Sequence, residues 1–107
     1  MPDIAQVKRT LRGPMIPVIT NLNHDLSIDH AAIRENVRFV VDRGVTRGQG
    51  VLLAVGAGGD FPMLTLDERK AAARTIVEAA QGQVPVIVGA QDTNPAVSIE
   101  MAQWAEQ

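Results

Sequence analysis

The chain has 107 residues, the size of one small domain, and its hydrophobic content of 46% and charged content of 21% are ordinary globular values. A formal net charge of −2 provides no basic surface, and no apolar run is long enough to span a bilayer, so neither nucleic acid nor a membrane is an expected partner. Cysteine is absent, which excludes disulfides and thiolate metal sites and fits a cytoplasmic protein.

Three short apolar runs predict β-strands near residues 15–20, 51–55 and 84–88. Each run is rich in β-branched residues, and the second and third are apolar on both faces. Continuous apolarity is typical of strands that are buried on both sides in a parallel sheet. Pro17 and Pro85 lie at or near strand starts, where a missing amide is easiest to tolerate.

Apolar residues at helical spacing predict helices near residues 29–43, 66–81 and 95–107. Ser27 or Asp29 can cap the first helix. Thr65 and Glu68 have the spacing of a capping box at the start of the second. Asn94 can cap the third, with a proline at its first position.

The order of elements is therefore β-α-β-α-β-α, with a repeat of roughly 35 residues, and eight such units would make about 280 residues. We expect residues 1–107 to form the first three units of a parallel (β/α)₈ barrel, which is incomplete at this length. An open, doubly wound sheet has the same alternation, so the spacing alone leaves both architectures open.

In both architectures ligands bind where the parallel strands end, which selects residues 20–23, 56–61 and 89–94. The second segment contains Gly56, Gly58 and Gly59, which allow backbone amides to approach an anion closely. A glycine-rich turn with a structural acid is the alternative interpretation. A dinucleotide fingerprint would need glycine at Phe61, so a nucleotide-binding domain is disfavoured.

Other polar residues offer little chemistry. His24 and His30 have no further ligand at metal spacing, so we expect surface residues and no metal site. Lys8 and Lys70 do not follow a strand, so neither is a Schiff-base nucleophile. A solvated helix face is expected for Arg69, Arg74 and Glu78.

Several motifs, in this order, resemble the dihydrodipicolinate synthase and N-acetylneuraminate lyase family. They are Gly13-x-x-x-Pro17-x-x-Thr20, Ile28-Asp29, Gly44-Val45, Gly56-Ala57-Gly58-Gly59-Asp60, Leu64-Thr65-x-x-Glu68-Arg69 and Pro85-Val86-Ile87-Val88-Gly89. The resemblance begins at Gly13 and covers the N-terminal third of such a protein. It implies a (β/α)₈ barrel and a class I aldolase without a cofactor, which forms an imine between a lysine and a 2-oxo acid such as pyruvate.

In the family a Gly-Thr-Thr-Gly-Glu motif stands at the second loop, and its threonines hold the substrate carboxylate. Ala57 and Gly58 occupy those two places here, so both hydroxyl groups are missing. The resemblance then implies a cradle formed by the amides of Gly58 and Gly59, with Asp60 in place of the glutamate and with Thr20 and Ala57 lining the pocket. A dehydratase or hydratase-aldolase relative, which takes another 2-oxo acid or an aldehyde, is the alternative within the family.

The family's Schiff-base lysine and its proton-shuttling tyrosine come from later strands, and this chain has no tyrosine, so the resemblance implies no catalytic residue within this chain. A non-catalytic truncated barrel that survives by association is therefore the alternative from another class. We expect a homo-oligomer, or association with the remainder of a barrel. The reason is that Val18, Leu53 and Ile87, or their neighbours, would otherwise face water on the inner side of the sheet.

Overall fold

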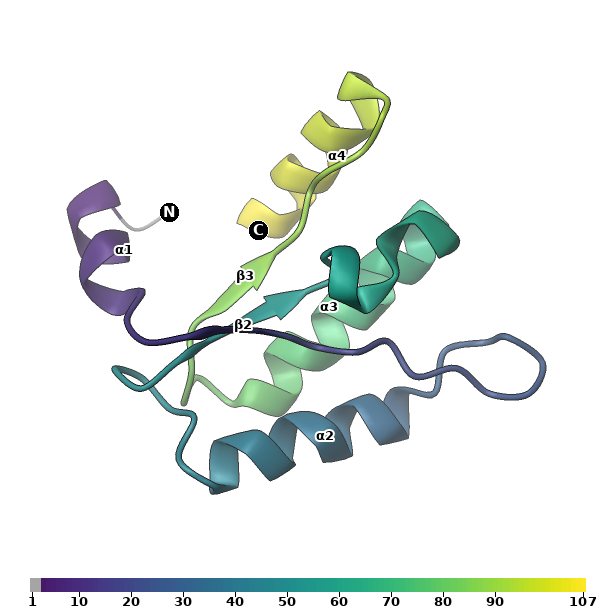
Figure 1. Ribbon diagram of the computed structural model, residues 1–107. Helices are drawn as coiled ribbons and strands as arrows, with labels where there is room; N and C mark the ends of the chain where they lie inside the picture. Colours follow the sequence, from purple (N-terminus) through teal and green to yellow (C-terminus); the bar gives the residue numbers. More distant parts are fainter. Residues whose placement is uncertain (1–2) are drawn as a thin grey trace.

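The computed structural model describes residues 3–107, which contain a three-stranded parallel sheet (Figure 1). Its strands, in spatial order, are β1 (Met15–Pro17), β2 (Val51–Ala54) and β3 (Val86–Val88). The register pairs Ile16 with Leu52 and Leu52 with Val86. The order along the sheet is the order along the chain, as consecutive β/α units require.

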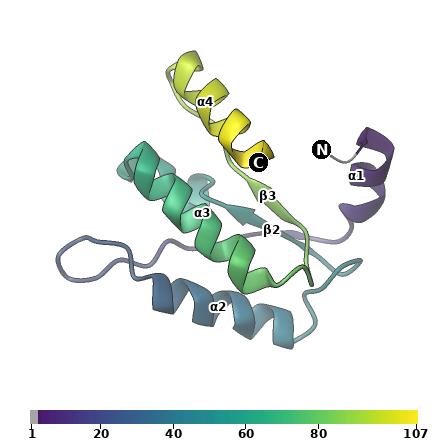
Figure 2. The ribbon, with the colours of Figure 1, turned by 180° about the vertical axis from the view of Figure 1, so that it is seen from behind.

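Each strand is followed by a helix, and the three helices are α2 (His30–Asp42), α3 (Leu66–Ala80) and α4 (Pro95–Glu106). Figures 1 and 2 show α2 and α3 side by side on one face of the sheet, with α4 next to β3. Within residues 3–107, no helix is both long and apolar enough to cross a membrane.

The predicted helix caps are confirmed. Asp29, rather than Ser27, caps α2 by accepting a hydrogen bond of 3.0 Å from the Ala32 amide. At the start of α3, the Glu68 amide donates to the Thr65 hydroxyl at 3.1 Å and the Thr65 amide donates to the Glu68 carboxylate at 2.9 Å. These bonds satisfy amides that the first turn of a helix leaves without partners, so each helix begins where its sequence signal lies.

The strands are shorter than the apolar runs that predict them. The Val18 amide still donates to the Leu53 carbonyl at 2.9 Å, but the chain bends sharply at Val55, directly after β2, where φ is 49°. Thr20, three residues after Pro17, therefore makes its hydrogen bond to the loop after β2 and not to a strand. β3 begins after Pro85, which has no amide to donate to the ladder.

A short helix, α1 (Ile4–Thr10), precedes β1 and is not predicted from the sequence. Asp3 caps it by accepting from the Gln6 amide at 2.8 Å. The helix buries none of its residues, and Ile4 remains 74% exposed. It therefore carries little of the apolar periodicity on which helix prediction depends.

The core lies between the sheet and its helices, and its largest fully buried side chains are Ile33, Leu52, Ile76, Met101, Val37 and Val55. Of the residues expected to face water, themselves or through their neighbours, Val18 does not: it is 7% exposed because its side chain points toward the helices. Leu53 and Ile87 are half-buried on the other face. On that face the exposed neighbours in the pleat are Pro17 and Ile19 of the first apolar run.

Candidate functional site

The candidate site lies where β1 and β2 end. Thr20, which follows β1, is 5% exposed, and its hydroxyl donates a hydrogen bond of 2.7 Å to the Gly59 carbonyl. This bond ties the end of the first strand to the glycine-rich loop that follows the second. Of the sequence-predicted residues, Thr20 and Gly59 are therefore in direct contact, and the Thr20 hydroxyl has a structural partner.

The loop contains a short 3₁₀ helix, η1 (Ala57–Gly59), between two residues in left-handed conformation. These residues are Val55, with φ of 49°, and Asp60, with φ of 59°. A β-branched residue such as valine rarely adopts a positive φ, and the strain is of order 1–3 kcal/mol. The surrounding structure must therefore hold the loop in this shape.

Two exposed residues of the loop have backbone amides that are available to a ligand. The Gly59 amide donates to the Gly56 carbonyl at 3.0 Å, and the Asp60 amide donates to the Ala57 carbonyl at 3.1 Å. The amides of Ala57 and Gly58 find no acceptor among residues 3–107, and both residues are exposed. The available pair is thus Ala57 and Gly58, one residue earlier than the predicted pair of Gly58 and Gly59.

The loop packs directly against the end of β1. A Cβ atom at Gly58 would lie 2.9 Å from the Cβ atom of Pro17, and one at Gly59 would lie 3.0 Å from the Val18 carbonyl oxygen. The absence of side chains at these two positions is what permits this close approach. Asp60 is exposed at the end of the turn, and its carbonyl accepts from the Met63 amide of a second 3₁₀ helix, η2 (Phe61–Met63).

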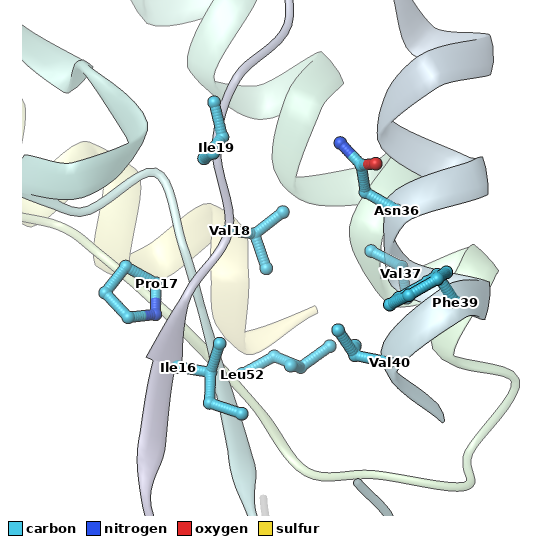
Figure 3. Close-up of a pocket in the computed structure, with 9 residues that line it drawn as sticks. All are labelled: Ile16, Pro17, Val18, Ile19, Asn36, Val37, Phe39, Val40 and Leu52. Carbon is cyan, nitrogen blue, oxygen red and sulfur yellow. The ribbon is translucent and has the colours of Figure 1, made fainter. Parts of the chain in front are cut away.

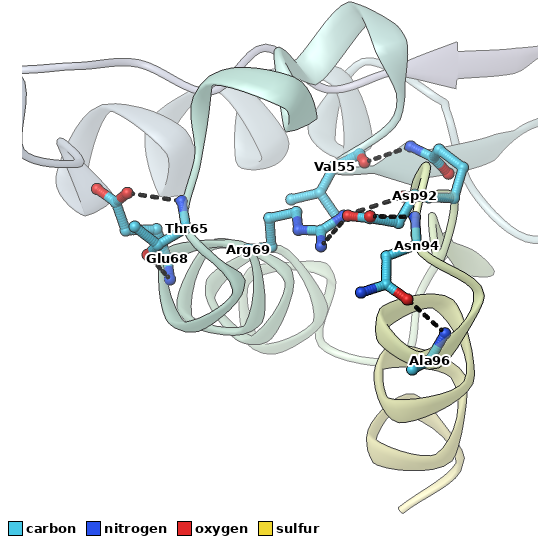
Figure 4. A network of polar contacts seen from close by, with 8 residues as sticks. Val55, Thr65, Glu68, Arg69, Asp92, Asn94 and Ala96 are labelled. Carbon is cyan, nitrogen blue, oxygen red and sulfur yellow. Dashed lines mark hydrogen bonds and ion pairs between the residues drawn. The ribbon is translucent and has the colours of Figure 1, made fainter.

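The expectation that Arg69 lies on a solvated helix face is wrong, because this residue is 3% exposed. Its guanidinium donates to the Asp92 carboxylate and to the Gln91 carbonyl, each at 3.0 Å (Figure 4). It also lies 5.8 Å from the centroid of the Phe61 ring. The sequence does not predict the burial of Arg69 because its hydrogen-bond partners come from another part of the chain. The apolar periodicity of one helix carries no information about such partners.

The remaining polar candidates lie outside this site. Lys8 is exposed on α1, and the Lys70 amine lies 3.3 Å from the Glu100 carboxylate. His30 Nδ1 lies 2.6 Å from the Thr75 hydroxyl, and this hydroxyl lies 3.0 Å from the Ala71 carbonyl of its own helix. No group of three or more metal-ligating side chains occurs within residues 3–107.

A groove with a volume of about 240 Å³ runs between β1 and α2 (Figure 3). Its walls include Ile16, Val18, Val37 and Leu52, and Asn36 is the polar residue at its rim. The groove lies on the flank of the sheet, where Val40 and other helix residues meet the strand, and not at the strand ends. It offers apolar surface but no groups for chemistry, so the loop after β2 remains the candidate site.

Comparisons with known proteins show which family the chain is similar to. Residues 10–107 match the dihydrodipicolinate synthetase family. A 4-hydroxy-tetrahydrodipicolinate synthase from Brucella abortus is 36% identical over 97 residues, which are 91% of this chain and 32% of the relative. The Bradyrhizobium diazoefficiens enzyme of the same name is 36% identical over 100 residues, or 94% of this chain and 32% of that relative.

Solved structures give the same result. YagE, an Escherichia coli prophage protein of the dihydrodipicolinic acid synthase family solved with pyruvate, superposes with a TM-score of 0.81 at 32% identity and covers 90% of this chain and 31% of its own. N-acetylneuraminate lyase from Proteus mirabilis has a TM-score of 0.82 at 26% identity, over 92% of this chain and 32% of its own. The chain thus spans about a third of the length of the proteins it matches.

Proposed function

Since the chain belongs to the dihydrodipicolinate synthetase family, we propose that it contributes the first carboxylate-binding wall of a lyase that acts on a 2-oxo acid such as pyruvate. The chain has the fold of the first three strand–helix units of a (β/α)₈ barrel. Active sites of such barrels lie at the C-terminal ends of the strands, which is where the glycine-rich loop is found.

The observation that carries this proposal is the pair of available amides at Ala57 and Gly58. Both lie at the start of a 3₁₀ turn, where N–H groups point outward and create a partially positive end. A carboxylate accepts hydrogen bonds from two neighbouring amides, and such charge-assisted bonds are stronger than neutral ones. Thr20 supports the cradle from below by holding the Gly59 carbonyl, and Asp60 borders it.

The covalent step belongs to groups outside residues 3–107. In the proposed reaction a lysine amine attacks C2 of the 2-oxo acid, the carbonyl oxygen leaves as water, and an imine remains. Lys8 lies on α1 and the Lys70 amine is paired with the Glu100 carboxylate, so we propose neither as the nucleophile. We propose that the lysine and the proton-shuttling tyrosine come from other strands of the barrel. We also propose that the barrel lies in the cytoplasm and assembles as an oligomer.

A second candidate function is a dehydratase or hydratase-aldolase of the same family. It is favoured by Ala57 and Gly58, whose side chains are a methyl group and a hydrogen atom. Both hydroxyl groups of the threonines in the family motif are therefore missing. A cradle made of amides alone recognises any 2-oxo acid by its carboxylate. The two candidates differ in the rest of the substrate, so binding of pyruvate should be compared with binding of a longer 2-oxo acid.

The test is to remove one amide without disturbing the turn. Ala57 is the first residue of η1, where proline is tolerated, and the preceding Gly56 is extended with ψ of −166°. Ala57→Pro in the protein expressed from its complete reading frame should weaken pyruvate binding by about tenfold in titration calorimetry. A side chain at Gly58 is a poorer test, because its Cβ atom would lie 2.9 Å from Pro17.

Ala57→Ser is the matched control, since it keeps the amide and should keep the affinity for pyruvate within about twofold. Borohydride reduction with pyruvate, followed by intact mass measurement, tests the covalent step. We expect one pyruvyl adduct on the protein from the complete reading frame and none on a chain of residues 1–107. An adduct on Lys8 or Lys70, or equal affinities for Ala57→Pro and Ala57→Ser, would contradict the proposal.

A further inference from the structure

The strained residue at the start of the candidate site has a partner in the loop that follows the neighbouring strand, β3. Val55 is 0% exposed with φ of 49°, and its carbonyl accepts a hydrogen bond of 3.0 Å from the side-chain amide of Gln91. In Figure 4 this bond is the dashed line at the Val55 oxygen. The bond reaches across 36 residues of sequence to the exact point where the chain leaves β2 for η1.

The surrounding backbone is shaped to admit this side chain. Gly89, which follows β3, donates its amide to the Ala54 carbonyl at 2.9 Å and so makes a last ladder bond before the bend. A Cβ atom at Gly89 would lie 2.7 Å from the Gln91 side-chain oxygen and 2.8 Å from the Val55 carbonyl oxygen. Any side chain at position 89 would therefore displace either the glutamine or the carbonyl that it holds.

Gln91 is itself fixed from the helix side. The buried guanidinium of Arg69 donates to the Gln91 carbonyl at 3.0 Å and pairs with Asp92 at 3.0 Å. The backbone of Gln91 is thus anchored to α3 while its side chain reaches back over Gly89. The Val55 carbonyl therefore accepts from the side chain of a residue whose backbone is hydrogen-bonded to α3.

We propose that Gln91 is a positioning residue, which keeps Val55 in its left-handed conformation and thereby aims the amides of Ala57 and Gly58 at the substrate carboxylate. This inference rests on the proposed function for its substrate but not for its geometry. Without the bond, Val55 would relax toward negative φ, and the direction of the following two N–H groups would change with it. Gln91 acts through the backbone and does not touch the substrate.

The test uses Gln91→Met, which keeps the length of the side chain, adds no charge near the carboxylate and cannot donate. In the protein from the complete reading frame, the variant should weaken pyruvate binding by about three- to tenfold, the value of one hydrogen bond. Gln103→Met on the exposed surface of α4 is the matched control and should leave the affinity unchanged. A loss of less than twofold for Gln91→Met would overturn the inference.

A double-mutant cycle separates positioning from general damage. Glycine adopts a positive φ without strain, so in a Val55→Gly background Gln91→Met should cost less than about twofold. The same loss in both backgrounds would show that Gln91 does not act through Val55.

If the unmodified protein binds no pyruvate, the proposed function fails, and hydrogen exchange then tests whether Gln91 holds the loop. The Gly59 and Asp60 amides should exchange at least about threefold faster in Gln91→Met, with Ala73 unchanged, and equal rates would overturn the inference.

Discussion

The two faces of the sheet are similar in sequence but very different in their surroundings. On the face that packs against α2 and α3, Val18 is 7% exposed and Leu52 is 0% exposed. On the opposite face of the first strand segment, Met15 is 54% exposed and Ile19 is 60% exposed. Apolar composition alone does not distinguish the faces. The difference arises because α2, α3 and α4 all follow parallel strands and are packed against the same side.

In a (β/α)₈ barrel the inward-facing side chains of a strand pack against those of other strands. Residues 3–107 supply three strands, and the chain spans about a third of the length of its relatives. The helix face is therefore stabilised by contacts within the chain, whereas the bare face depends on further strands or on another molecule. Three predictions test this distinction, beginning with the largest effect.

The first prediction compares one substitution on each face. Leu52→Ala removes a fully buried side chain from the centre of the helix face and should lower the free energy of unfolding by about 2–5 kcal/mol. Met15→Ala, on the bare face of the neighbouring strand, should cost less than about 1 kcal/mol. Urea unfolding of residues 1–107, followed by circular dichroism at a protein concentration too low for self-association, measures both. Equal losses would mean that the bare face is packed in solution.

The second prediction concerns the bare face itself. β1 is an edge strand with apolar side chains exposed, and in a pure solution a second copy of the chain is the available partner. The chain should therefore self-associate, and Ile19→Lys should raise the dissociation constant at least about tenfold, or about 1.4 kcal/mol. Ile99→Lys, at a side chain 58% exposed on α4, is the control and should change little. A sharp monomer peak in size-exclusion chromatography with light scattering would contradict this prediction.

The sequence predicts those parts of the fold that depend on neighbouring residues. The order of strands and helices follows from apolar periodicity, and the caps at Asp29, Thr65 and Asn94 follow from hydrogen bonds that reach two or three residues along the chain. The strand ends are less predictable. The extent of β1 depends on the bend at Val55, directly after the neighbouring strand β2, which no pattern local to β1 reveals.

The candidate site is predicted in position but not in detail. Glycine spacing and the rule that ligands bind at strand ends identify residues 56–60. Which amides are available depends on the 3₁₀ turn, and this turn uses the Gly59 amide internally. The roles of Arg69 and Gln91 depend on contacts across 22 to 36 residues of sequence, so periodicity assigns one of them to solvent and is silent about the other.

The third prediction sharpens the comparison with a region that belongs to neither face. The loop of residues 21–29 follows the first strand. The Asn23 amide donates to the Ser27 carbonyl and the Asp29 amide donates to the Asn21 carbonyl, each at 2.8 Å. Within this loop, the Ser27 hydroxyl donates to the Asp25 carboxylate at 2.6 Å and the Ser27 amide donates at 3.0 Å. These bonds stabilise the ionised form and lower the pKa of Asp25 below its usual 3.8.

Because the pKa of Asp25 is lower in the folded loop, the stabilisation is present above pH 3.8 and is lost as the pH falls through the folded-state value. A carboxyl-detected NMR titration should give Asp25 a pKa below 3.8. Ser27→Ala should raise the pKa of Asp25 toward that value, while Ser98→Ala on α4 should leave it unchanged. The loop amides should lose protection on acidification before those of Ile33 and Ile76, which are buried in the core. Simultaneous loss in the loop and the core would mean that the loop and the helix face unfold as one unit.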